Sequence, residues 1–191
     1  MTVWFTADLH LGHRNIIDHC HRPWQTVEEM DDAIVTRWNH VVMPGDSVYV
    51  LGDVALCRPE RAIELVSRLR GQKFLIVGNH DKSLIRKAAF RDLFAWVKDL
   101  YCVKIADPDA PDARQRIVLC HYAMRTWHQQ HHGTWHLYGH SHGTLPIDIC
   151  SRSMDVGVDT CGFYPLSYEE VKGVLGCRTQ AQVDHHNARP E

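Results

Sequence analysis

Long apolar runs are absent from this chain of 191 residues. None approaches the roughly 20 residues that a helix needs to cross a bilayer. The opening residues, Met1-Thr2-Val3-Trp4-Phe5, also lack the basic region and the long apolar segment of a signal peptide. These absences argue against a membrane partner and against secretion, so we expect a cytoplasmic protein.

Closely spaced cysteine pairs of the zinc-knuckle type are missing too. An odd number of cysteines without a secretion signal predicts reduced thiols, several of them buried as small hydrophobes, rather than a disulfide framework. The seven cysteines are Cys20, Cys57, Cys102, Cys120, Cys150, Cys161 and Cys177.

A strongly basic face is the third absence. The formal net charge is -2 and the lysines and arginines are scattered, which argues against an extended duplex nucleic-acid surface but not against a short nucleotide substrate. No internal repeat or domain boundary is visible, and the length suits one domain. We expect a single domain over residues 1–175 and a polar, flexible tail over residues 176–191. The sequence indicates no oligomeric state.

Strands and helices alternate in the first half of the chain. Apolar, β-prone runs predict strands at residues 3–7, 47–51 and 74–77. Thr26 and Glu29 have the spacing of a capping box, and Pro59 opens a second helical pattern that stops at Gly71. A third, basic helix is expected over residues 83–90. This alternation predicts an α/β layered fold with parallel strands at its centre.

The second half consists of shorter strands separated by turns. A polar, proline-containing hairpin loop is expected at residues 107–112. Ser167 and Glu170 predict the cap of a last helix that runs through Leu175. The expected strands cover residues 100–105, 116–120, 135–138 and 154–158.

Polar side chains follow most of these strands, and the chain is rich in histidine, with 15 residues. Surplus histidine indicates metal binding, proton transfer or pH sensing more often than packing. Because ligand crevices of open α/β sheets lie beyond the carboxyl ends of the strands, we expect these groups to meet in one place. They are Asp8, His10, Asp53, Asn79, His80, His121, His140 and His142.

Seven of these side chains form a candidate metal-ligand set: two carboxylates, one amide and four imidazoles. Mixed oxygen and nitrogen ligands suit Mn²⁺ first, with Fe, Zn, Ni or Co as alternatives. Seven ligands are too many for one ion, but they divide between two ions about 3.5–4 Å apart if one carboxylate bridges. Taken singly, each motif has a structural alternative, such as a turn at Gly52-Asp53 or an exposed loop at His140-Ser141-His142.

Together the motifs resemble the calcineurin-like metallophosphoesterases. The resemblance runs from residue 8 to residue 142, in the family's order. It consists of Asp8-x-His10, Gly52-Asp53, Gly78-Asn79-His80-Asp81, His121 and Gly139-His140-Ser141-His142. The Asp-Leu-His-Leu-Gly-His-Arg-Asn opening and the Trp-His-Leu-Tyr-Gly-His-Ser-His run look like a small, single-domain bacterial and phage subgroup.

The resemblance implies two mixed β-sheets packed as a sandwich flanked by helices, with a dimetal site at the C-terminal ends of the strands. Carried over, the first ion is held by Asp8, His10, Asp53 and His142, and the second by Asp53, Asn79, His121 and His140. His80 becomes the catalytic imidazole that assists the leaving group, and Asp81 the partner that orients it. A hydroxide held between the ions is then the nucleophile, without a phosphoenzyme.

Substrate contacts are the least defined part of the pattern. Arg14 and Arg125 are candidate phosphate clamps, and Asn15 lies beside the first motif. His13 either contacts phosphate or leaving group, or packs against the first loop. His136 and the histidines between it and Trp127 could line the pocket, but no role is assigned to them. Trp127 and Trp135 either stack on a base or belong to the core.

The sequence therefore predicts a dimetal phosphoesterase. Without a cap domain the site should be open, which favours a phosphodiester of nucleotide or cyclic-nucleotide type. The alternatives are a phosphomonoesterase, including a protein phosphatase, and a metal-binding interaction module without turnover. Apolar residues at Val54-Ala55-Leu56 depart from the family pattern, in which a polar residue often follows the Gly-Asp pair.

Overall fold

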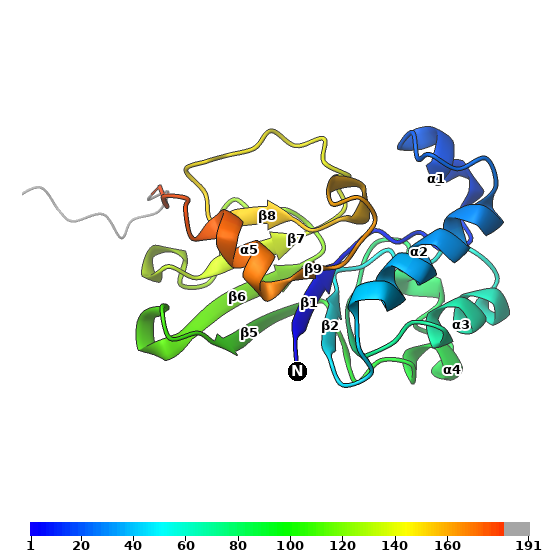
Figure 1. Ribbon diagram of the computed structural model, residues 1–191, viewed down its shortest axis with the longest axis horizontal. Helices are drawn as coiled ribbons and strands as arrows, with labels where there is room; N and C mark the ends of the chain where they lie inside the picture. Colours follow the sequence, from blue (N-terminus) through cyan, green and yellow to red (C-terminus); the bar gives the residue numbers. More distant parts are fainter. Residues whose placement is uncertain (182–191) are drawn as a thin grey trace, which may run out of the picture.

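The computed structural model describes residues 1–181 and consists of two β-sheets packed face to face, with helices around them (Figure 1). This is the expected architecture of two mixed sheets with flanking helices. None of the helices in residues 1–181 is long and apolar enough to cross a membrane.

The first sheet has the strand order β4-β3-β2-β1-β9. Its central strands are parallel, and only β9 pairs antiparallel, with β1. Consecutive strands along the chain lie side by side because helices carry the chain back across one face. The strands are β1 (Val3–Thr6), β2 (Ser47–Val50), β3 (Gln72–Ile76), β4 (Val97–Lys98) and β9 (Leu166–Ser167).

The second sheet has the order β5-β6-β7-β8, in which β5 and β6 form an antiparallel hairpin and the other pairs are parallel. The polar loop between β5 and β6 is the expected hairpin connection. The strands are β5 (Leu100–Ala106), β6 (Arg114–Cys120), β7 (Trp135–Tyr138) and β8 (Ser153–Asp155).

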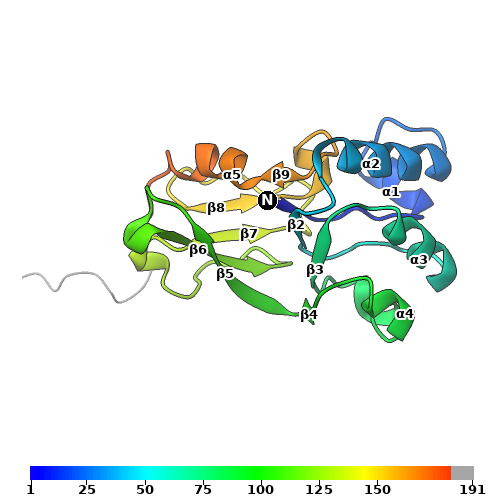
Figure 2. The ribbon, with the colours of Figure 1, turned by 60° about the horizontal axis from the view of Figure 1, so that its bottom comes forward.

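Helices cover the outer face of the first sheet, and α5 lies beside β8 and β9 (Figure 2). Both predicted capping boxes are present, Thr26 with Glu29 before α2 and Ser167 with Glu170 before α5. The helices are α1 (Arg14–His19), α2 (Val27–Val41), α3 (Pro59–Ser67), α4 (Ala88–Arg91) and α5 (Tyr168–Leu175).

Two apolar cores fill the space on either side of the first sheet. Val48 and Val50 of β2 face the core beneath the helices, where Trp38 is fully buried. Tyr49 between them faces the other core, which lies between the sheets and includes Phe5. Because successive side chains of a strand point to opposite faces, a strand buried on both sides is apolar throughout.

The helix expected over residues 83–90 is wrong. The chain forms a 3-10 turn at Asp81–Ser83, then passes through an extended residue, Lys87, into the short helix α4. Leu84 and Phe90 are both buried, six positions apart. One continuous helix would place side chains at that spacing on different faces, so the chain bends to bury both.

The segment after α5 begins in contact with the residues just before β8. The backbone N–H of Arg152 donates to Gln180 Oε1 at 3.0 Å, and that of Ala181 donates to Cys150 O at 2.8 Å. The rest of the expected flexible tail, residues 182–191, lies outside the described residues.

All seven cysteines are free, as predicted. None is fully buried, however: Cys150 and Cys177 are exposed and the others are half-buried. Their burial as small hydrophobes is therefore only partial.

Candidate metal centre

The carboxyl ends of five strands from both sheets bring the predicted ligands to one edge of the molecule. Asp8 follows β1, Asp53 follows β2 and Asn79 follows β3, while His121 comes directly after β6. The loop after β7 contributes His140 and His142. The sandwich thus brings together side chains that are as far apart in sequence as residues 8 and 142, a separation of 134 positions.

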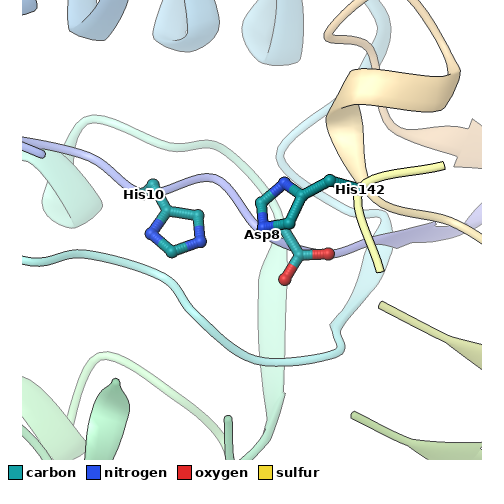
Figure 3. A group of neighbouring side chains, drawn as sticks. All are labelled: Asp8, His10 and His142. Atoms are coloured by element: carbon teal, nitrogen blue, oxygen red, sulfur yellow. The ribbon is translucent and has the colours of Figure 1, made fainter. Parts of the chain in front are cut away.

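One group comprises Asp8, His10 and His142. One potential ligand atom from each of these side chains lies within 4.8 Å of the others. Figure 3 shows His142 reaching the Asp8 carboxylate from a separate segment of the chain. This group matches three of the four ligands that the family resemblance implies for a first ion.

A second group comprises Asp53, His121 and His140, again with ligand atoms within 4.8 Å of one another. Asn79 belongs beside it, because its Oδ1 lies 2.9 Å from His121 Nε2. These are the four residues implied for a second ion.

Asp53 lies between the two groups. Its Oδ2 is 3.6 Å from His10 Nε2 in the first group and 3.5 Å from His121 Nε2 in the second. A carboxylate in this position can contact ions in both groups, which is what a bridging ligand requires.

The chemistry of the donor set fits cations. His121 Nδ1 lies 2.7 Å from the carbonyl oxygen of Leu51 and can donate to it, so a neutral ring carries its lone pair on Nε2. That lone pair then faces the Asn79 amide oxygen and the Asp53 carboxylate, so three acceptors converge without a proton among them. Without a cation these lone pairs would repel one another, and a bound cation would offset that repulsion.

Two buried atoms of the first group point to the same conclusion. Asp8 Oδ1 and His10 Nε2 are buried and have no hydrogen-bond partner in the described structure. An unpaired polar atom in the interior costs about 1–3 kcal/mol, so both atoms need a partner. Metal coordination provides one for each.

Burial shifts the pKa values of His10 and Asp8 in opposite directions. It lowers the pKa of His10 to about 2, with the nearby Arg22 guanidinium adding to the effect, so the ring stays neutral. Burial also raises the pKa of Asp8 well above its ordinary value. A bound cation acts in the opposite direction on Asp8 and keeps the carboxylate ionised.

Backbone strain is concentrated at these ligands. Asp8, His10, Asp53, His140 and His142 all have positive φ angles, between 47° and 67°. Non-glycine residues rarely adopt this conformation, and it persists where the surrounding structure enforces it, often at functional sites. The turns at the strand ends therefore direct these side chains toward the site at the cost of a strained backbone conformation.

Two glycines make room for the carboxylates. A Cβ on Gly78 would lie 2.2 Å from Asp53 Oδ1, and a Cβ on Gly139 would lie 2.6 Å from Asp8 Oδ2. Close approach is the reason for glycine at these positions, since neither has a positive φ.

His80 lies at the rim of the second group. Its ring Nε2 is 3.9 Å from Asp53 Oδ2 and its side chain is 38% exposed, so a substrate can reach it. Asp81 does not orient this ring. Its fully buried carboxylate instead accepts hydrogen bonds from the backbone N–H groups of Asp53, Val54 and Gly78, which fixes the two strand-end turns.

Asp159 and Arg22 support the site, although neither belongs to a motif that the sequence makes visible. The Asp159 carboxylate lies 2.7 Å from His142 Nδ1 and receives two hydrogen bonds from the buried Arg22 guanidinium. Arg22 also donates to the carbonyl oxygens of Asp8 and Leu9. Burial lowers the pKa of His142, but the hydrogen bond to Asp159 and the nearby Asp8 raise it above its ordinary value overall.

The candidate substrate contacts separate into two kinds. His13 is at the site, with its Nδ1 3.2 Å from His10 Nδ1, and Arg125 lines a cavity beside His142. Arg14 and Asn15 are exposed on α1 and contact none of the predicted ligands in residues 1–181; Arg14 pairs with Asp18.

Three other candidates for a pocket wall are part of the core. Trp127 and Trp135 are 7% and 4% exposed, and His136 is fully buried. His136 lies between the Val118 carbonyl oxygen and the Met124 N–H, and burial lowers its pKa to about 4. A neutral His136 therefore links two strands rather than facing substrate.

The family model of the calcineurin-like phosphoesterases matches residues 1–144, which is most of the chain. The chain belongs to this family, whose members are metal-dependent phosphoesterases. The resemblance based on the motifs is thus confirmed.

Individual proteins are similar to this chain in sequence or in fold. An uncharacterized protein of Methanocaldococcus jannaschii is 43% identical over 82 residues, which cover 42% of this chain and 47% of that protein. The Gene 66 protein of Mycobacterium phage L5 is 28% identical over 84% of this chain and 87% of its own length. The crystal structure of a protein of unknown function from Aquifex aeolicus has the same fold, with a TM-score of 0.64, 20% identity, and coverage of 90% of this chain and 98% of that one.

Proposed function

We propose that this protein is a two-metal phosphodiesterase. The observation that carries the proposal is the position of the Asp53 carboxylate, with its Oδ2 3.6 Å from His10 Nε2 and 3.5 Å from His121 Nε2. Asp8, His10, Asp53 and His142 hold one ion in this proposal, and Asp53, Asn79, His121 and His140 hold the other. Mn²⁺ is the ion we propose first, because mixed oxygen and imidazole ligands suit it.

With two divalent ions bound, such a site would gain an activated water and neutralisation of the charge that develops on the phosphoryl oxygens. The chain itself supplies positioning. Asp81 fixes the turns that carry Asp53 and Gly78, Asp159 fixes the His142 ring, and His80 protonates the leaving oxygen or stabilises its charge. His13, next to His10 at the rim, is placed to contact the phosphate or the leaving group.

The openness of the site favours a diester. His140 is exposed and His80 is 38% exposed, so a phosphate with two organic substituents can reach both groups. A small monoester would leave much of this rim without contact.

The test compares two chromogenic esters with purified, Mn²⁺-loaded protein. We expect hydrolysis of bis-p-nitrophenyl phosphate with a higher kcat/KM than that of p-nitrophenyl phosphate. The reverse preference would make the protein a monoesterase, and failure to cleave either compound would count against the enzymatic proposal.

A further inference from the structure

A cavity of about 880 Å³ opens beside the first ligand group. His142 and Asp159 stand at its edge, and it extends away from them between β8, the end of α5 and residues 143–152. Figure 1 shows this last segment, in yellow, arching away from the sheet between β7 and β8. The volume lies within the range of about 300–1,000 Å³ that is usual for small-molecule sites.

Its walls combine an apolar surface with a few polar groups. Met124, Leu145, Ile147, Met154 and Val174 provide the apolar part. Leu145 and Ile147 are 44% and 79% exposed, so the segment between β7 and β8 presents apolar side chains that the protein itself does not cover. Binding sites for organic groups have this composition, with polar groups few and placed for orientation.

Gln130 provides the polar feature that points to a ligand. Gln130 is one of the residues that line the cavity, it is 4% exposed, and its Oε1 is buried without a hydrogen-bond partner in residues 1–181. A buried amide oxygen without a donor is costly, and a ligand N–H group within the cavity would satisfy it. Arg125 lines the same space and can approach an anionic part of the ligand.

The cavity lies on the His142 side of the candidate site and not on the His80 side. Among the seven predicted metal ligands, all of which lie in the described part of the chain, only His142 lines the cavity, and His80 does not line it. The His10 ring contacts both of these rings, at centroid distances of 5.2 Å and 5.4 Å, whereas no ring contact joins His80 to His142 in the described part of the chain. A group bound in the cavity therefore belongs to the side of the substrate away from His80.

Building on the proposed function, we propose that this cavity binds the organic substituent that stays on phosphorus, a group of nucleoside size with a ring N–H that donates to Gln130. His80 then serves the other substituent, which leaves. The substrate is accordingly a nucleotide diester rather than a simple alkyl phosphate.

The experiment uses diesters that share p-nitrophenolate as leaving group and differ only in the retained substituent. With the Mn²⁺-loaded protein, the p-nitrophenyl ester of thymidine 5′-monophosphate should have a kcat/KM at least about tenfold above that of methyl p-nitrophenyl phosphate. Equal values for the two esters would overturn the inference while leaving the proposed phosphodiesterase intact.

Variants connect the preference to the cavity. Val174→Trp places a large ring in it from α5, and Gln130→Leu removes the acceptor; each should lower kcat/KM for the thymidine ester at least about fivefold and leave the methyl ester unchanged. Glu169→Trp puts the same ring on an exposed position of α5 outside the cavity and should change neither. A parallel loss for both esters in Val174→Trp and Gln130→Leu would mean that these residues act only through the fold.

Binding of thymidine 5′-monophosphate, measured by calorimetry, separates this inference from the proposed function. If no ester is cleaved but the nucleotide binds and Val174→Trp weakens it, the cavity assignment stands and the phosphodiesterase proposal fails. Absence of binding, or binding that Val174→Trp does not change, would overturn the cavity assignment whatever the activity.

Discussion

At the scale of single residues, Asp53 connects the two groups of candidate metal ligands. Its Oδ1 accepts the backbone N–H of His80 at 2.9 Å, its own N–H donates to Asp81, and its Oδ2 faces both histidine groups. Asp81 thereby holds the proposed bridging ligand instead of the proposed catalytic ring of His80. The adjacency of His80 and Asp81 in sequence suggested a pair, but the 3-10 turn that begins at Asp81 directs the two side chains apart.

Removal of the His80 ring tests its proposed role. His80→Ala should lower kcat by a factor of roughly 10²–10⁴, because the leaving oxygen loses its proton donor, with metal content unchanged. Elemental analysis of the purified variant provides the second readout. Loss of metal in this variant would show that His80 is a ligand and not the general acid.

Asp159 lies outside the motifs, and its substitution tests whether it supports the proposed metal site. Asp159→Asn should weaken Mn²⁺ binding by about 10–100-fold, because the His142 ring loses the carboxylate that fixes its orientation. Asp32→Asn is the matched control, since Asp32 is an exposed carboxylate that pairs with Arg68 and not with any predicted ligand in residues 1–181. Equal Mn²⁺ affinity of Asp159→Asn and the wild type would contradict the positioning role.

At the scale of elements, the sequence predicted those strands and helices whose signals are local. Apolar runs followed by polar groups located β1, β2 and β3, and the capping boxes located α2 and α5. The short strands β4 and β9 carry too few residues for a pattern and exist through pairing with distant strands. The predicted helix over residues 83–90 failed for a related reason, because burial of Leu84 and Phe90 decides that segment.

The turn after β3 is tightly constrained, and Gly78→Ala tests it. The added Cβ would lie 2.2 Å from Asp53 Oδ1, so Asp53 or the turn must shift. We expect a loss of Mn²⁺ affinity and of kcat of at least about tenfold, measured by metal titration and hydrolysis. Gly173→Ala is the control, since nothing lies within 4 Å of its Cβ position on α5. An active Gly78→Ala enzyme with full metal affinity would refute the close-approach argument.

The contact between α5 and the β5–β6 loop should make the stability of the fold depend on pH, and the direction of this dependence follows from the pKa of Asp107. Asp107 is hydrogen-bonded by Lys172 Nζ at 2.7 Å and by the Tyr168 hydroxyl, and these contacts hold the pKa of its carboxyl below the usual range. A depressed folded-state pKa contributes stability above the unfolded pKa of about 3.9 and loses it as the pH falls through the folded value.

Asp107→Asn should therefore lower Tm at pH 7, and the difference from the wild type should shrink as the pH falls below about 4. Asp109→Asn, which removes the exposed second partner of the same lysine, should have a smaller effect. Thermal unfolding followed by circular dichroism between pH 3 and pH 7, about the range of the carboxyl titration, gives both curves. A Tm difference that is constant over this range would exclude the Asp107 titration as its source.

At the scale of the whole molecule, the candidate site results from the meeting of two sheets. The motifs predicted the candidate ligands because polar side chains follow several strands at once, and the family resemblance divided them between two ions. The sequence alone could not predict the roles of Asp159 and Arg22 or the cavity beneath residues 143–152, because each depends on contacts between distant segments. No local periodicity or spacing marks such contacts.

The central claim is that the two ligand groups hold two ions that act together on a phosphate ester. Metal-free protein can be titrated with Mn²⁺ while bound metal and hydrolysis of bis-p-nitrophenyl phosphate are measured on the same samples. The account predicts two Mn²⁺ per chain at saturation, with activity that rises as the second ion binds. Hydrolysis that persists in the metal-free protein, or full activity with a single ion bound, would contradict it.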